Sequence, residues 1–160
     1  MKVKYQIKQK IFSLGDGFKI KNDAGEDVYT VKSQLLSIGN KLKILDLSGN
    51  ELCNIEQKLL KFMPEYKIII SGQEIATVKK KFSLLRHSFV INGTGGDFTV
   101  EGNYTGHEFK IKNGNTVVAM ISKKFFSMSD TYGVEIDDGQ DQVVGLALAI
   151  VIDMVCHDQK

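Results

Sequence analysis

The chain has 160 residues, with 21 Lys and Arg against 19 Asp and Glu, and 42% of its residues are hydrophobic. This length suits one domain, residues 1–160, with one substantial core, and the composition excludes a mainly disordered chain. A formal net charge of +2 argues against a nucleic-acid-binding protein. Fifteen glycines against one proline predict many tight turns between short strands.

The chain begins with apolar and charged residues in alternation, which is the pattern of a strand with one buried face. Tyr5 and Ile7 fall on one face, while Lys4 and Lys8 fall on the other. No continuous apolar stretch of a secretory signal is present at this end. The same reasoning along the chain predicts about twelve strands, at residues 4–12, 17–22, 27–32, 41–47, 51–58, 66–71, 74–82, 86–91, 97–103, 106–112, 117–124 and 131–136.

A weak internal repeat runs through these strands. Aligning the sequence on Gly25, Gly49, Gly72 and Gly114 places an aliphatic residue three positions after each glycine and a second one six positions after it. A short strand-like segment precedes each glycine, so each copy predicts a β-hairpin. The repeats are too short and too uneven for propeller blades of roughly 40 to 45 residues, and they favour a meander.

The last segment, 143–156, is apolar at nearly every position. As a helix it would be apolar on all faces and would need burial on every side. Its six β-branched residues leave a buried strand as the alternative. Fourteen residues are long for a strand, however, and Asp137, Asp138 and Asp141 lie where an N-terminal cap is needed. We therefore expect a helix at about 141–156.

This helix is too short to cross a membrane. Residues 142–156 would span about 22 Å against a hydrocarbon core of roughly 30 Å, and Asp153 interrupts the apolar run. A helix that needs burial on all sides, in a chain of about twelve strands, fits best inside a closed barrel. Closure would also remove the exposed sheet edges that invite aggregation.

The order of several motifs resembles the LURP-one-related family, whose relatives include the tubby C-terminal domain and the phospholipid scramblases. The motifs that carry this resemblance are Asp23-Ala-Gly25 with Val28-Tyr-Thr-Val31, Val78-Lys-Lys-Lys81-Phe82, Gly102-Asn-Tyr104, Phe109-Lys-Ile111, Val118-Ala-Met-Ile-Ser-Lys-Lys124, Asp130-Thr-Tyr-Gly-Val-Glu-Ile136 and Ile152-Asp153. The resemblance covers nearly the whole chain. It implies a mainly β fold, a twelve-stranded closed antiparallel barrel enclosing a central hydrophobic C-terminal α-helix.

The same resemblance suggests a ligand. Tubby proteins bind phosphoinositide headgroups through Lys and Arg, although their binding residues do not align with particular positions here. Scramblases carry a Cys-rich, palmitoylated segment, which this chain lacks, so anchoring by acylation is not expected. The two cysteines, Cys53 and Cys156, have no metal or redox spacing and are expected to be buried thiols in a reducing, cytoplasmic setting.

The candidate ligand-binding residues are cationic. They form two clusters, one with the only arginine of the chain, at Lys79, Lys80, Lys81 and Arg86, and the other at Lys123 and Lys124. If the repeats are equivalent hairpins, both clusters end their strands in the same way and could hold an anionic headgroup at a barrel rim. The alternative is a solvated face whose lysines only keep the barrel soluble. Arg86 could bind an anion in bidentate geometry or pair with a carboxylate.

Other chemistries find little support. The three histidines, His87, His107 and His157, are far apart and lack motif partners, so no catalytic residue is assigned. Residues 92–97 lack the Lys-Ser/Thr of a phosphate-binding loop and are expected to form a turn. Residues 137–141 lack the spacing of a calcium loop and are expected to cap the helix. We expect no cofactor, no metal and no nucleic-acid partner.

The sequence thus predicts a single-domain, non-enzymatic cytoplasmic barrel, with peripheral contact at a membrane. Its expected activity is recognition of an anionic ligand such as a phospholipid or phosphoinositide headgroup. The alternative is a protein-protein interaction or structural module with no lipid ligand. An enzyme would require a deep pocket that holds His87 or His107 beside a carboxylate.

Overall fold

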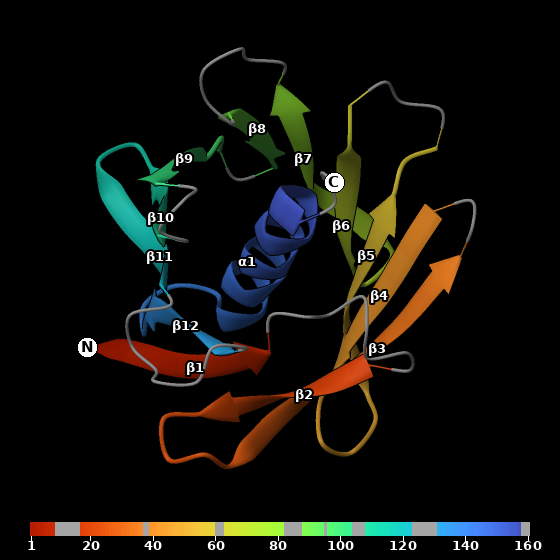
Figure 1. Ribbon diagram of the computed structural model, residues 1–160, viewed down its shortest axis with the longest axis vertical. Helices are drawn as coiled ribbons and strands as arrows, with labels where there is room; N and C mark the ends of the chain where they lie inside the picture. The colour runs from red at the N-terminus through yellow and green to blue at the C-terminus, as the bar shows by residue number, and fades with distance from the viewer. Residues whose placement is uncertain are drawn as a thin grey trace.

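A computed structural model describes residues 1–8, 17–36, 39–59, 63–81, 88–94, 96–103, 108–122 and 131–157. These residues form twelve strands and one C-terminal helix (Figure 1). The elements are β1 (Lys2–Lys8), β2 (Gly17–Asn22), β3 (Asp27–Leu36), β4 (Gly39–Leu45), β5 (Glu51–Gln57), β6 (Glu65–Ile70), β7 (Gln73–Lys81), β8 (Ser88–Gly93), β9 (Thr99–Asn103), β10 (Glu108–Asn113), β11 (Thr116–Ser122), β12 (Thr131–Asp137) and α1 (Gln142–His157).

The strands form one antiparallel sheet in the order β8-β7-β6-β5-β4-β3-β2-β1-β12-β11-β10-β9. The sheet curls around α1, as Figure 1 shows. Its two edge strands, β8 and β9, meet at one bridge, where the Phe98 amide donates to the Ile91 carbonyl at 3.0 Å. The barrel is therefore nearly closed. The predicted fold class, the number of strands and the C-terminal helix are confirmed.

Strand boundaries differ from the sequence prediction by a few residues. β1 begins two residues earlier than predicted because Lys2 pairs with Asp137 of β12. β3 extends to Leu36, four residues beyond its predicted end, and pairs there with Gly39 of β4. Both differences arise from pairing with a neighbouring strand, which the local pattern does not contain.

The four glycines of the repeat lie in hairpin turns. Gly25, Gly49, Gly72 and Gly114 have φ angles of 84°, 92°, 78° and 61°, in the left-handed region that favours glycine. They connect β2 to β3, β4 to β5, β6 to β7 and β10 to β11. The predicted repeat of β-hairpins is therefore confirmed.

The direction of the strands defines two ends of the barrel. All strand pairs are antiparallel, so odd-numbered strands run toward the end where α1 ends, and even-numbered strands run toward the end where α1 begins. Every turn that follows an even-numbered strand therefore lies at the end where α1 begins. β7 and β11 both finish at the opposite end.

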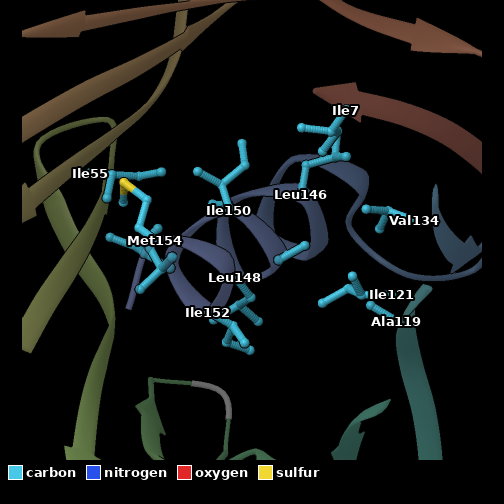
Figure 2. Packing of buried hydrophobic residues seen from close by; sticks show 14 of the residues in the cluster. Ile7, Ile55, Ala119, Ile121, Val134, Leu146, Leu148, Ile150, Ile152 and Met154 are labelled. Atoms are coloured by element: carbon cyan, nitrogen blue, oxygen red, sulfur yellow. The ribbon is translucent and has the colours of Figure 1, made fainter. Parts of the chain in front are cut away.

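Helix α1 forms the centre of the core. Its residues 145–155 are all buried, and most of the side chains are 0–1% exposed. Figure 2 shows Met154 pointing toward Ile55 of β5, while Leu148 and Ile152 leave the opposite side of the helix. Burial on every side is what an apolar helix without a polar stripe requires. Among the described residues, no helix is long and apolar enough to span a membrane.

We expect truncation of a helix side chain to destabilise the protein strongly. Leu148 is 1% exposed, and Leu148→Ala should lower the free energy of unfolding by about 2–5 kcal/mol, because it leaves a cavity between the helix and the strands. Urea denaturation measures this change. The matched control is Leu47→Ala, which removes the same atoms from a side chain that is 62% exposed and should cost less than about 0.5 kcal/mol. Equal effects would contradict the central role of α1.

Candidate functional site

The two predicted cationic clusters belong to strands that finish at the same end of the barrel. β7 ends at Lys81 and β11 ends at Ser122, at the end where α1 ends. Arg86, Lys123 and Lys124 lie outside the described residues. Across β8, β9 and β10 the two strands are four positions apart, which corresponds to at least about 19 Å along the sheet at about 4.8 Å per strand. A single phosphate group cannot contact both strand ends.

Lys79 and Lys80 point to opposite sides of β7. Lys79 is exposed, and its ammonium lies 3.2 Å from the carboxylate of Glu65, which also lies 3.9 Å from Lys58. Lys80 is 6% exposed and shares the inward face of β7 with the fully buried Val78. Successive side chains of a strand alternate between the two faces of the sheet. The structure therefore places Lys80 inside the barrel, apart from the exposed surface that includes Lys79.

Along the outer face of β4 to β7, the lysines whose side chains are described have carboxylate partners. Glu56 lies 3.9 Å from Lys41 and 3.5 Å from Lys67, so one carboxylate is shared by two ammonium groups. Lys58 also lies 3.5 Å from Glu74. Exposed pairs of this kind contribute little to stability, but they leave the outer face of these strands with little net charge.

A different group of lysines lies on the outer face of β2, β3 and β4. We call it the lysine face, and it consists of Lys19, Lys32, Lys41 and Lys43, which are all exposed. Lys32 is the register partner of Lys43 on the neighbouring strand. Lys43 lies 3.6 Å from Glu51. Lys32, by contrast, has no carboxylate within 4.0 Å in the part of the chain that the structure describes.

Acidic residues gather at the end where α1 begins. The described residues of the six turns there, 23–26, 46–50, 71–72, 94–97, 114–115 and 138–141, include no Lys or Arg. Their carboxylates are Asp23, Glu26, Asp46, Asp97, Asp138 and Asp141. Hydrogen bonds from Asn50 and Ser48 hold the pKa of Asp46 below its usual value, so this turn stays charged. The described turns at the end where α1 begins are therefore acidic.

Three aspartates lie at the start of α1. Asp141 accepts a hydrogen bond from the Val144 amide at 3.1 Å and is the N-cap of the helix. Asp137 accepts one from the Gly139 amide at 3.1 Å, and Asp138 lies 3.6 Å from the N-terminal amine. The predicted capping role is thus confirmed for Asp141. No group of three or more His, Cys, Asp or Glu among the described residues is arranged to hold a metal.

The barrel interior contains a few ionisable groups. Asp153 of α1 is 9% exposed, and Tyr132 of β12 is 2% exposed. Burial, followed by the charge of Asp153, raises the pKa of the Tyr132 hydroxyl well above its usual value. Burial is also the main reason that the pKa of the Cys53 thiol rises to about 12. Cys53 therefore behaves as a core residue and not as a nucleophile.

The remaining sequence candidates are either structural or not described. Residues 92–97 lead into β9, a strand, and Gly96 has a φ of 126°, so this segment contains a turn as predicted. His157 is the last residue of α1. His87 and His107 lie outside the described residues.

Sequence reasoning did not select the lysine face. Its lysines alternate with buried residues as on any solvated strand, for example Lys41 and Lys43 on either side of Leu42. What distinguishes Lys32 is that Lys43 lies opposite it, and this depends on the register of β3 on β4. The extension of β3 to Leu36, which sets this register, ends in a connection without the Asn-Gly or Asp-Gly signal of a short hairpin.

Comparisons with known proteins agree with this architecture. The model of the LURP-one-related family matches residues 3–153. The uncharacterized protein YxjI of Bacillus subtilis (strain 168) is 34% identical over 154 residues, which cover 96% of this chain and 94% of that protein. An X-ray structure of an Arabidopsis thaliana protein superposes with a TM-score of 0.66 at 18% identity, over 96% of this chain and 91% of the other. The last comparison concerns the fold alone.

We expect Cys53 to resist alkylation in the folded protein. With a pKa of about 12, only about one thiol in ten thousand is ionised at pH 8, and the side chain is 1% exposed. Iodoacetamide followed by peptide mass spectrometry should find Cys53 unmodified in buffer and fully modified in urea. Rapid labelling of Cys53 in buffer would contradict its assignment to the core.

Proposed function

The chain belongs to the LURP-one-related family, and we propose that it is a non-enzymatic binding module for an anionic ligand, such as a phospholipid or phosphoinositide headgroup. The observation that carries the proposal is that the described turns where α1 begins are acidic, whereas Lys41, Lys58 and Lys79 lie toward the opposite end. The turns where α1 begins contain six carboxylates and no described cation. On β5 and β6, toward the opposite end, the carboxylates of Glu56 and Glu65 are each shared by two lysines.

The packing of the core supports a surface site. Side chains of α1 fill the centre of the barrel, and residues 146–152 of the helix are 0–1% exposed (Figure 2). An internal ligand would have to displace these apolar contacts. A headgroup bound at the outer surface requires no such change.

The charge distribution also supports a preferred orientation. An anionic surface attracts the end rich in lysine and repels the end rich in carboxylates. In this proposal the headgroup contacts Lys79, Lys81 and Arg86, and Lys123 and Lys124 are the second candidate cluster from the sequence. Lys80 is left out because its side chain is buried. The protein would then contact a membrane peripherally, through electrostatic attraction.

Vesicle flotation tests this function. We expect the protein to float with vesicles of phosphatidylcholine and phosphatidylserine but not with phosphatidylcholine alone, and to dissociate as salt screens the charges. Each lysine near an anionic surface contributes about 1 kcal/mol, so Lys79→Gln combined with Lys81→Gln should weaken binding about 30-fold if this rim is the contact.

The matched control combines Lys2→Gln with Lys110→Gln. It removes the same charge from exposed residues, Lys2 where α1 begins and Lys110 on β10. It should leave flotation nearly unchanged. Equal and negligible binding of the wild-type protein to both kinds of vesicle would refute lipid recognition and favour the alternative, in which the lysines only keep a protein-interaction module soluble.

A further inference from the structure

Lys32 lies at the centre of the lysine face. On one side, Lys43 of β4 is directly opposite, and Lys41 is two residues from Lys43 on the same strand. On the other side, Lys19 of β2 pairs with Thr30 and is therefore the diagonal neighbour of Lys32. Directly opposite residues have Cβ atoms about 4.5–5.5 Å apart, and diagonal neighbours about 7–8 Å apart. Three lysines thus flank a fourth on the same face of the sheet.

This arrangement is unfavourable in the free protein. Like charges directly opposite one another on a sheet are destabilising, and Lys32 and Lys43 are such a pair. Lys43 has Glu51 at 3.6 Å and Lys41 has Glu56 at 3.9 Å, and both glutamates are on β5, the side away from Lys32. Among the described residues, no carboxylate lies within 4.0 Å of Lys32.

Other lysines near this region have a local partner. Lys19 donates a hydrogen bond to the Thr30 hydroxyl at 2.8 Å, and Lys21 lies 2.8 Å from Asp27. Further along the sheet, Lys67 on β6 and Lys79 on β7 each have a glutamate partner. A need for solubility applies to all of these lysines and does not explain why Lys32 differs from them. A bound anion next to Lys32 would explain the difference.

The neighbouring position on β2 contributes no side chain beside Lys32. The register partner of Lys32 on β2 is Gly17, which has no side chain. A Cβ at this position would overlap the Val31 carbonyl oxygen at 1.9 Å, and the φ of Gly17 is 134°, so the backbone requires glycine here. Lys32 is therefore flanked by a lysine on one side and by a glycine on the other.

We propose that the lysine face binds a phosphomonoester, with the phosphate held between the ammonium groups of Lys32 and Lys43. A phosphomonoester carries about −1.5 to −2 charges at pH 7, which matches two lysines, and its oxygens accept several hydrogen bonds. Lysine acts as a flexible point charge toward phosphate, so two opposite side chains can converge on one group. This inference rests on the proposed function for its ligand class, but it assigns the contact to β3 and β4 and not to the ends of β7 and β11.

The first experiment separates the two sources of phosphate. Backbone amide shifts are followed by NMR while inorganic phosphate is added to the wild-type protein, and flotation compares phosphatidylcholine vesicles that contain phosphatidic acid, a phosphomonoester, with vesicles that contain phosphatidylglycerol, a phosphodiester. We expect the largest shifts at Lys32 and Lys43, and stronger flotation with phosphatidic acid. Shifts without flotation would support the site with a soluble ligand and would refute lipid binding.

The second experiment changes the site. Lys32→Glu should weaken phosphate binding at least tenfold, whereas Lys110→Glu, an exposed lysine on β10, should leave it within twofold. Because Lys32→Glu also replaces a like-charge pair with an opposite-charge pair, it should raise the melting temperature of the free protein. A lysine that only keeps the protein soluble would not show the loss of binding and the gain in stability together.

Several outcomes would overturn the inference. If wild type and Lys32→Glu bind phosphatidic acid vesicles equally, the function stands and this site is wrong. If neither phosphate nor vesicles bind the wild-type protein, both are wrong. If a polyglutamate peptide shifts Lys32 and Lys43 while phosphate does not, the ligand class is wrong.

Discussion

The structure depends on the need to bury α1 on every side. Its described side chains between residues 145 and 155 leave no polar stripe for solvent, apart from Asp153, which is itself 9% exposed. One sheet face covers one side of such a helix, so the sheet has to curl until its two edges approach each other. Among the described residues, the two edges of the sheet meet at the bridge between Ile91 and Phe98. Closure is then a consequence of the helix as much as of strand pairing.

The start of the helix is fixed by polar contacts that the strands supply. Tyr5 of β1 donates a hydrogen bond to the Gln142 side chain at 2.9 Å, and Gln142 donates to the Asp137 carbonyl at 2.9 Å. Together with the Asp141 cap, these contacts join β1, β12 and α1 at one end of the barrel. Burial of the Tyr5 hydroxyl raises its pKa, so it remains a hydrogen-bond donor at neutral pH. Carboxylates near this end also complement the positive end of the helix dipole.

The sequence predicted those elements of the fold that depend on residues close together in the chain. Alternation predicted the strands, and the glycines at 25, 49, 72 and 114 predicted hairpin turns whose φ angles are indeed positive. The uniformly apolar segment and Asp141 predicted the helix. These features depend on local geometry and on burial, both of which appear in the order of residues.

The candidate site depended on contacts between strands, and there the local pattern was not enough. Three consecutive lysines, 79–81, looked like one cationic cluster, but alternation turns Lys80 into the core and Glu65 pairs with Lys79. The sequence of either strand alone does not show that Lys32 lies opposite Lys43. If the register were shifted by one residue, each lysine would have a different partner. The register of the strands therefore decides which charged side chains of this barrel are neighbours.

The filled interior of the barrel is consistent with a site among the charged residues on its outer surface. Because α1 fills the space that some other barrels use for a ligand, the ligand contacts that we propose lie on the outside of the sheet. On β4 to β7, lysines and glutamates mostly neutralise each other. On β3, by contrast, Lys32 has no carboxylate within 4.0 Å among the described residues and lies opposite Lys43, an arrangement that is unfavourable in the free protein. An unfavourable contact of this kind is expected at a functional site, where a bound ligand can offset its cost.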